Sequence, residues 1–384
     1  MALHVMEEAN RCLGCKKPRC REGCPIHTNI PEVIRLLKDG KLNDAGWMLF
    51  ENNPLTTVCS IVCNHEKQCE GHCIRGIKDV PVHFSIIENY ISTTYANQMK
   101  AGPAPSNGRK VAIIGAGPSG ITIAIILARY GYDVTIFDSK DKIGGVMRYG
   151  IPDFRLPDSV LDDIAYRHLE LKGIKFRPNT TIGGAISLDD LFRDGYQSIF
   201  VGAGLWRPKT LHIKGETLGH VAFAINYLAS PGAFHLGERI IVIGSGNSAM
   251  DCARTAIRQG AHYVTVFNRR DKIAASEYEA SYAKLEGVEF EMMKSPVEIL
   301  DDGVVFADNA YDEEGHTSRP GVFAAGDVAH GASTVVHAVA TGKQVAEAMH
   351  AYMQSLPMPE PSPYANVPKA ETIEASVLSE QVIK

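Results

Sequence analysis

The spacing of hydrophobic positions along this chain changes near residue 110. Before it, short stretches with helical spacing alternate with loops that carry cysteines. Residues 30–37 (IPEVIRLL) predict a helix with Pro in its first turn, ended by Gly40. A second helix is predicted around residues 82–95, and the Ala-, Gly- and Pro-rich stretch 101–108 reads as a linker. The first hundred residues are therefore expected to be helical.

From Lys110 onward, short apolar runs alternate with helical patterns. VAIIG at 111–115 predicts a buried strand, 121–130 a helix and DVTIFD at 133–138 the next strand; RIIVIG, a helix through Arg258 and YVTVFNR repeat this order from Arg239. Each unit is typical of the start of a dinucleotide-binding fold. Further strands are predicted at 198–204 and 321–328 and a helix at 335–352, whereas the Pro- and Glu-rich tail from 355 predicts little structure.

Composition narrows the class of protein. The chain has 384 residues, a formal charge of −5, 45% hydrophobic and 22% charged residues, which at about 100–200 residues per domain predicts two or three globular domains. The sequence lacks the clusters of Lys and Arg that are typical of nucleic-acid binding, so no nucleic-acid partner is expected. The start lacks the pattern of a signal peptide, and the apolar stretch 111–128 is interrupted by Gly and Pro, so we expect no membrane span and a cytoplasmic location.

Eight of the nine cysteines form two runs between residues 12 and 73. The first has the spacing C-x2-C-x4-C-x3-C-P and the second C-x3-C-x5-C-x3-C; the members are Cys12, Cys15, Cys20 and Cys24, then Cys59, Cys63, Cys69 and Cys73. In a reducing compartment such runs more often hold metal than form disulfides. The spacing favours two [4Fe–4S] clusters over zinc ribbons, which usually show two C-x2-C pairs. Cys252 is expected to be an inert buried thiol.

The first glycine-rich loop follows the strand at 111–115 and precedes a helix. It reads Gly115-Ala-Gly117-Pro118-Ser119-Gly120, and Asp138 ends the next strand. In this motif the glycines allow the tight turn, the approach of a pyrophosphate and the packing of helix on strand, while the acid binds a ribose hydroxyl.

The second loop carries Ala at the third glycine position. Its residues are Gly244, Ser245, Gly246, Asn247 and Ser248, and the next strand ends in Arg269-Arg270 rather than in an acid. Arginine at that point suits a 2′-phosphate, which favours NADP over NAD; a solvated pair of surface arginines is the alternative. After the later strand, Gly326-Asp327 offers a carboxylate for a flavin ribityl hydroxyl.

The order of these motifs resembles one family of flavoproteins. The double cysteine run, GAGPSG, Gly144-Gly145, GIPDFRLP at 150–157, GSGNSAMDCAR and VFAAGDV are similar to the small (β) subunit of NADPH-dependent glutamate synthase. The family includes the N-terminal half of dihydropyrimidine dehydrogenase, its bacterial electron-input subunit and the large subunit of electron-bifurcating ferredoxin:NADP oxidoreductase. The resemblance covers residues 5–352.

The resemblance implies an α/β fold with two Rossmann-like domains of the glutathione-reductase type, the NAD(P) domain inserted in the FAD domain, behind an α-helical iron–sulfur domain. It implies FAD, NADP or NAD, and two [4Fe–4S] clusters. The expected domains are 1–100 for the clusters, a linker at 101–109, 110–236 with 320–354 for FAD, 237–319 for NAD(P), and a tail at 355–384.

The resemblance also assigns ligands. It implies Cys12, Cys15, Cys20 and Glu88 for one cluster, Cys24, Cys63, Cys69 and Cys73 for the other, Cys59 as a spare thiol, and Gly145, Arg155 and Thr334 near the flavin. The chain departs from the family between Arg270 and Gly321, where only residues 271–320 stand in place of a longer stretch, and in Asn247, where many relatives carry Asp. The NAD(P) domain is therefore expected to be shortened.

The function that follows is that of an electron-input subunit. Electrons pass from NADPH through FAD and the clusters to a larger partner subunit, and no side-chain acid–base pair is needed, so no catalytic residue is assigned. The alternatives are a relay subunit without productive nicotinamide binding, or a subunit of the dihydropyrimidine dehydrogenase or ferredoxin:NADP oxidoreductase type.

Overall fold

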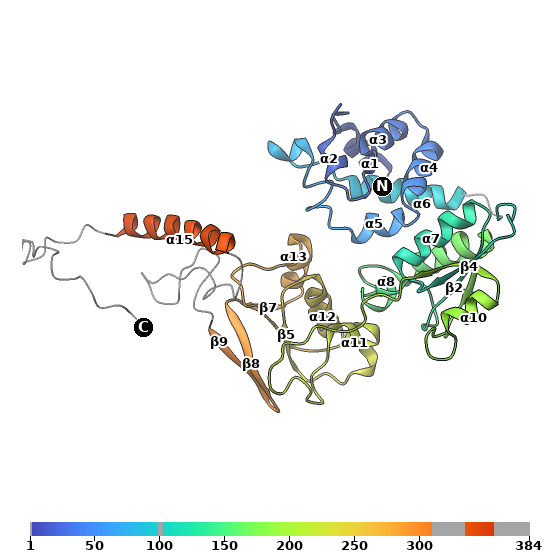
Figure 1. Cartoon of the computed structure of the whole chain (residues 1–384). Coiled ribbons are helices and arrows are strands. Elements are labelled where there is room, and N and C mark those ends of the chain that lie inside the picture. The colour runs from blue at the N-terminus through green and yellow to red at the C-terminus, as the bar shows by residue number, and fades with distance from the viewer. Residues whose placement is uncertain (1, 99–102, 309–334, 357–384) are drawn as a thin grey trace, which may run out of the picture. The chain divides into compact units, whose positions relative to one another are not determined.

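The computed structural model describes residues 2–98, 103–308 and 335–356 (Figure 1). The chain divides into two compact units, Met1–Asp308 and Asn309–Lys384. Within the first we distinguish a helical region (2–98), a first α/β region (103–223) and a second α/β region (224–308). In the second unit the described element is helix α15 (Val335–Ser355), which confirms the helix predicted at 335–352.

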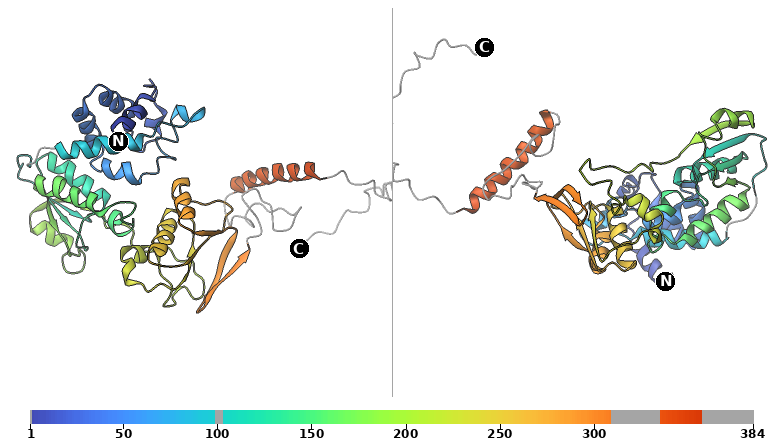
Figure 2. Two further views of the ribbon diagram at one scale, coloured as in Figure 1. Left: turned by 180° about the vertical axis from the view of Figure 1, so that it is seen from behind. Right: turned by 90° about the horizontal axis from the view of Figure 1, so that it is seen from below.

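The helical region (blue to cyan in Figure 2) is built around α6, which contacts α1, α3, α4 and α5. The predicted helix at 30–37 is confirmed as α3, whose apolar face is buried. The elements are α1 (Ala2–Asn10), α2 (Arg19–Glu22), α3 (Ile30–Lys38), α4 (Leu42–Asn52), α5 (Thr56–Val62), the 3-10 helix η1 (Ile74–Ile77) and α6 (Phe84–Gln98).

The first α/β region contains a parallel sheet of order β3-β2-β1-β4. This is the order expected for one half of a Rossmann fold. Its strands are β1 (Lys110–Ile114), β2 (Asp133–Phe137), β3 (Lys175–Arg177) and β4 (Tyr196–Val201). Its helices are α7 (Pro118–Arg129), α8 (Val146–Tyr149), α9 (Asp158–Ile164), the π-helix η2 (Ala165–Leu169), η3 (Glu170–Lys172) and α10 (Leu188–Arg193).

The second α/β region repeats this architecture in a shorter form. Its parallel sheet has the order β5-β6-β7, followed by an antiparallel hairpin of β8 and β9. The strands are β5 (Arg239–Ile243), β6 (Tyr263–Phe267), β7 (Glu289–Glu291), β8 (Lys294–Leu300) and β9 (Gly303–Asp308), and the helices are α11 (Ala224–Ala229), η4 (Pro231–Ala233), α12 (Asn247–Arg258) and α13 (Glu277–Leu285).

The buried cores show which regions are joined by apolar packing. Phe50, Leu55 and Val58 of the helical region belong to the same core as Ile113 and Ile121 of the first α/β region. The second α/β region has a core of its own around α12 and β6. Hydrophobic burial therefore joins the first two regions, and polar side chains dominate the joint with the third.

The pattern of apolar residues predicts the central elements correctly. The strands expected at 111–115, 133–138, 198–204, 239–244 and 263–269 are present as β1, β2, β4, β5 and β6, and the helices after both glycine loops are α7 and α12. The predicted strand at 321–328 lies outside the described residues. In the described part of the chain no helix is both long and apolar enough to cross a bilayer.

Candidate functional site

Four cysteines of the helical region form a first group. Cys12, Cys15, Cys20 and Cys73 line one cavity, whose wall Cys69 also reaches. The pKa of the Cys20 thiol is raised to about 11, first by burial and then by the neighbouring thiols of Cys73, Cys12 and Cys15. The structure therefore brings Cys73 to the first run, although the family resemblance implies it for the second.

The other four cysteines form a second group around a carboxylate. The pKa of Cys63 is raised to about 12 by burial and then by Cys59, Glu88 and Cys24, and the pKa of Cys69 is raised by burial and by a set that includes Glu88, Cys63 and Cys24. Glu88 thus raises the pKa of both of these thiols, and Cys59 raises the pKa of Cys63. Members of both cysteine runs meet here, because Cys24 comes from the first.

Glu88 is buried, with 6% of its surface exposed. Thr56 Oγ1 donates a hydrogen bond of 2.7 Å to Glu88 Oε1, and His65 Nε2 lies 4.0 Å from Oε2. The structure places this carboxylate beside the second group, not beside Cys12, Cys15 and Cys20. The Cys59 thiol accepts a hydrogen bond of 3.1 Å from Asn53 Nδ2.

The donor chemistry of both groups fits iron–sulfur clusters. All nine cysteines are free thiols, and in each group ionised thiols would repel one another, which cationic iron relieves. Among the described residues, no three His, Cys, Asp or Glu side chains converge on a point where one metal ion would sit. A cubane has four separate corners and does not require its ligands to converge in that way.

The first glycine loop has the backbone that a pyrophosphate site requires. Gly115 has φ +105°, and a Cβ there would lie 2.2 Å from the Gly202 carbonyl oxygen; a Cβ at Gly120 would lie 2.0 Å from the Gly115 carbonyl oxygen. Gly117 faces open space, and a Cβ on Gly145, which has φ +53°, would lie 2.8 Å from the Gly117 Cα. Glycine is therefore needed at positions 115, 120 and 145, and the open space at Gly117 lets an anion approach the start of α7.

Asp138 holds this loop by its backbone. Its Oδ2 accepts a hydrogen bond of 2.6 Å from Ala116 N–H, and its Oδ1 accepts one of 2.8 Å from Lys140 N–H. Pro118 and Ser119 are exposed at the first turn of α7. The carboxylate retains lone pairs for a ribose hydroxyl, since each oxygen can accept more than one hydrogen bond.

Two aromatic side chains near this loop were missed by sequence reasoning. Tyr149 and Trp206 meet edge to face at 6.4 Å between ring centroids, and Lys140 Nζ lies 5.2 Å from the first ring and 5.3 Å from the second. The Tyr149 hydroxyl donates to Asp141 Oδ1 at 2.5 Å. No spacing rule in the sequence marks these residues.

The second glycine loop is tied to the segment before α13. Asn247 Oδ1 accepts a hydrogen bond of 2.9 Å from Ser276 N–H, and Ser245 Oγ accepts one of 3.1 Å from Ala274 N–H. Gly244 has φ +107°, and both it and Gly246 face open space. The loop thus leaves its glycines free for a phosphate at the start of α12.

A cavity of about 460 Å³ lies over this loop. It is lined by Gly244, Gly246, Asn247, Ser248, Ala249, Cys252, Ala224, Val242, Ile243 and Ala274, and by Asn64 of the helical region. Arg269 and Arg270 are exposed at the end of β6. Cys252 is buried, and burial raises the pKa of its thiol to about 12, as expected for an unreactive thiol.

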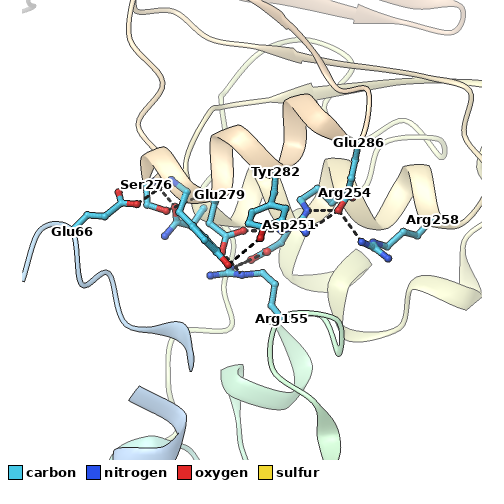
Figure 3. A network of polar contacts seen from close by, with 11 residues as sticks. Glu66, Arg155, Asp251, Arg254, Arg258, Ser276, Glu279, Tyr282 and Glu286 are labelled. Atoms are coloured by element: carbon cyan, nitrogen blue, oxygen red, sulfur yellow. Dashed lines mark hydrogen bonds and ion pairs between the residues drawn. The ribbon is translucent and has the colours of Figure 1, made fainter. Parts of the chain in front are cut away.

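Arg155 lies in the joint between the two α/β regions (Figure 3). Its Nη1 donates to both oxygens of Asp251, at 2.9 and 2.8 Å, and its Nε lies 2.7 Å from Glu279 Oε1. The resemblance implies that Arg155 contacts FAD; the structure shows its guanidinium bound to Asp251 of α12 and to Glu279 of α13. All three side chains are at least 89% buried, because their exposed fractions are 11%, 4% and 7%.

The network continues along α12. Arg254 Nη1 donates to Glu279 at 2.9 Å, and Glu286 accepts from Arg254 at 2.9 Å and from Arg258 at 2.7 Å. Burial raises the pKa of the Asp251 carboxyl to about 6, although the Arg155 guanidinium opposes the rise. The sequence does not mark Asp251, because its burial, which makes the carboxylate require a cation from elsewhere, is decided by tertiary packing.

His168 is a second buried titratable group, where the helical and first α/β regions meet. Its ring stacks on Phe50 at 5.0 Å, its Nδ1 has no hydrogen-bond partner, and burial lowers its pKa from 6.5 to about 4. A lowered histidine pKa stabilises the fold above pH 6.5, and this contribution is lost as the pH falls towards 4.

We therefore expect the free energy of unfolding to fall by roughly 2 kcal/mol more in the wild type than in His168→Leu between pH 7 and 5. The raised pKa of Asp251 has the opposite sign, so the comparison with the variant is needed. Denaturant unfolding at each pH measures the free energy of unfolding. An equal change between pH 7 and 5 in the wild type and in His168→Leu would contradict the prediction.

Gly326, Asp327 and Thr334 lie outside the described residues. The structure therefore does not place these three predicted flavin contacts.

Tyr227 and Leu228 precede residue 237, where the NAD(P) domain is expected to begin. They nevertheless pack against Cys252 of α12, which belongs to the second α/β region.

Comparison with family models divides the chain in the same order. A model described as dihydropyrimidine dehydrogenase domain II, 4Fe-4S cluster, matches residues 2–100. An NAD(P)-binding Rossmann-like domain matches residues 113–162, and a pyridine nucleotide-disulphide oxidoreductase domain matches residues 184–311.

Curated relatives match nearly the whole chain. The glutamate synthase [NADPH] small chain of Azospirillum brasilense is 32% identical over 434 residues, covering 91% of this chain and 89% of the relative. The NAD-dependent dihydropyrimidine dehydrogenase subunit PreT of Escherichia coli is 32% identical over 397 residues, covering 92% of this chain and 95% of the relative. Thioredoxin reductase of Lactococcus lactis is 23% identical over 65% of this chain and 100% of its own, with a TM-score of 0.41.

Proposed function

Because this chain belongs to the family of glutamate synthase small chains and dihydropyrimidine dehydrogenase subunits, we propose that it is the electron-input subunit of a larger enzyme. The matched family models make the chain an NAD(P)H-dependent flavoprotein oxidoreductase with a 4Fe-4S domain. The observation that carries the proposal is the presence, in one compact unit, of two glycine loops and two cysteine groups.

The chain's own residues have separable roles in this proposal. The loop Gly115–Gly120 binds the FAD pyrophosphate at the start of α7, Asp138 fixes that loop, and Gly145 keeps the space beside Gly117 clear. Gly244–Ser248 bind the NADPH pyrophosphate over the cavity at α12. When bound, FAD takes up two electrons together from the nicotinamide and releases them singly.

The cysteine groups support a definite set of cluster ligands. We assign Cys12, Cys15, Cys20 and Cys73 to one [4Fe–4S] cluster, because these thiols line one cavity and the other three raise the pKa of Cys20. For the second cluster we assign Cys24, Cys63, Cys69 and Glu88. Glu88 lies within electrostatic reach of both Cys63 and Cys69, and the family resemblance implies Glu88 as a ligand and Cys59 as a spare thiol. Cys59 is therefore left as a spare thiol.

The nucleotide and the partner are supported by different observations. The relatives are named for NADPH in one case and for NAD in the other, so the relatives leave the choice open. Arg269 and Arg270 are exposed at the end of β6 and carry the positive charge that a 2′-phosphate requires. The relatives are named as a small chain and a subunit, which supports a larger partner that receives the electrons.

Anaerobic mixing with NADPH tests the function. The protein, reconstituted with FAD, iron and sulfide, is expected to lose its flavin absorbance band, and the clusters are expected to give the electron paramagnetic resonance (EPR) signals of reduced centres. NADH at the same concentration should react more slowly, because it lacks the phosphate that the arginines bind. Reduction by dithionite without reduction by either nucleotide would contradict the proposal.

A relay without nicotinamide binding is the second candidate. The alignment with the Azospirillum relative spans 434 residues, more than the 384 of this chain, so that relative carries residues that this chain lacks. The described part of the second α/β region holds a three-stranded parallel sheet. The mixing experiment separates the two candidates.

A further inference from the structure

The helical region reaches the second α/β region through one carboxylate. Glu66 Oε2 accepts a hydrogen bond of 3.0 Å from Glu277 N–H, and Glu66 Oε1 accepts one of 3.1 Å from Tyr278 N–H (Figure 3). These are the first two amides of α13, which have no partner inside the helix. A carboxylate is favourable at this end of a helix, because it faces the positive end of the helix dipole.

The same segment forms part of the wall of the nucleotide cavity. Asn64 is the residue of the helical region that lines the 460 Å³ cavity over Gly244–Ser248. Its Oδ1 accepts a hydrogen bond of 3.3 Å from Lys67 N–H. Its amide nitrogen donates to no acceptor among the described residues, so it is free to donate to a molecule in the cavity.

Hydrogen bonds connect Glu66 with the glycine loop itself. Glu66 binds the first turn of α13, Ser276 precedes that turn, and Ser276 N–H donates to Asn247 Oδ1 at 2.9 Å. The second α/β region has its own core, so these polar contacts, with those of Arg155, hold it against the rest of the unit. The position of Asn64 at the cavity therefore depends on Glu66.

We propose that residues 64–66 of the helical region are part of the nicotinamide nucleotide site. Asn64 donates a hydrogen bond from its amide to the bound nucleotide, and Glu66 is a positioning residue that holds Asn64 at the cavity. The inference rests on the proposed function, since it requires a nucleotide over the second glycine loop. It makes the nucleotide site composite, with one wall supplied by the region that carries the cysteines.

The test is the binding of NADP⁺ to the oxidised, reconstituted full-length protein, measured by isothermal titration calorimetry. Asn64→Ala is expected to weaken binding about three- to tenfold, the effect of one lost hydrogen bond. Glu66→Gln is expected to weaken it in the same direction, because a neutral amide caps the two α13 amides less well. The matched control is Glu7→Gln, since Glu7 is an exposed glutamate of the same region without a side-chain partner among the described residues.

The double variant identifies how Glu66 acts. If Glu66 acts by placing Asn64, then Asn64→Ala/Glu66→Gln binds NADP⁺ no more weakly than Asn64→Ala alone, whereas independent effects multiply. The NADPH concentration that gives half of the limiting rate of flavin reduction should rise in Asn64→Ala by the same factor as the dissociation constant of NADP⁺, because the side chain acts on nucleotide binding.

The outcomes are separable. A wild-type protein that binds neither NADP⁺ nor NAD⁺ overturns the proposed function, and the inference with it. A wild type that binds, together with an Asn64→Ala variant equal to Glu7→Gln, overturns the inference alone. Multiplying effects in the double variant overturn the positioning role of Glu66. Asn64→Ala does not remove a buried contact, so it carries the test even where Glu66→Gln folds poorly.

Discussion

Replacing Cys73 by serine is expected to remove the same iron–sulfur cluster that Cys12→Ser removes. Cys73 lies in the cavity of Cys12, Cys15 and Cys20, and its thiol acts on the pKa of Cys20. A hydroxyl is a poor ligand for iron in such a cluster, which prefers soft thiolates. Each variant should therefore keep the second cluster and lose about half of the iron and acid-labile sulfide, because a cluster with a missing ligand does not persist.

EPR spectra of the reduced variants measure this expectation. Cys73→Ser and Cys12→Ser should lose one and the same signal, and Cys24→Ser should lose the other. Cys59→Ala is the matched control, since Cys59 is a half-buried thiol of the second group that we leave without iron. A Cys73→Ser spectrum that matches Cys24→Ser would refute the grouping, and loss of a signal in Cys59→Ala would show that Cys59 is a ligand.

Replacing Arg155 by methionine is expected to destabilise the protein by about 3 kcal/mol at neutral pH, which is the usual effect of breaking a buried ion pair by removing one partner. The change leaves the carboxylates of Asp251 and Glu279 buried, with Arg254 as their remaining close cation. Flavin reduction by NADPH should also slow, since Arg155 holds the second α/β region on the first by polar contacts.

The loss of unfolding free energy in Arg155→Met is expected to become smaller as the pH falls. The pKa of Asp251 is about 6 in the wild type, and removing the guanidinium raises it further. Below that pH the carboxyl is protonated and no longer needs a cation, so the difference in unfolding free energy between variant and wild type should shrink from pH 8 to pH 5. Denaturant unfolding at both pH values measures it.

The matched control for this prediction is Arg35→Met. Arg35 forms two ion pairs on the surface, at 2.6 Å to Glu32 and 2.6 Å to Asp39, with 54% of its side chain exposed. Exposed pairs contribute about 0–1 kcal/mol. A loss in Arg155→Met no larger than in Arg35→Met, or one that grows as the pH falls, would contradict the role given to the buried network.

Tertiary structure corrects the sequence where distant residues meet. Sequence spacing assigns the four cysteines at 12–24 to neighbouring ligand positions, but it does not say which later cysteine completes each group. The chain between Cys24 and Cys59 folds into α3 and α4, and this returns Cys73 to Cys20 and brings Cys59 to Cys24. The family resemblance marks Glu88 as a ligand candidate. The packing of α6 on α5 decides which cysteine group it lies beside.

The shortest strands also could not be predicted from the pattern of apolar residues. β3 and β7 have three residues each, too few for an apolar period to be recognised. They form because a parallel neighbour is already in place. Asn64, Glu66 and Asp251 fall in the same class, since polar residues of this kind are ordinary on a surface and gain a role only when another region covers them.

What the sequence by itself determined is local. Glycines that must adopt positive φ, a run of apolar residues long enough for a buried strand, and cysteines within one loop are properties of neighbouring residues, so both nucleotide folds and the cysteine chemistry could be read from the printed chain. Only the tertiary structure decided which groups face one another across regions: Arg155 with Asp251, Glu66 with α13, and Cys73 with Cys12. Such pairs depend on the path of the whole chain, and no spacing along the sequence encodes the distance between them.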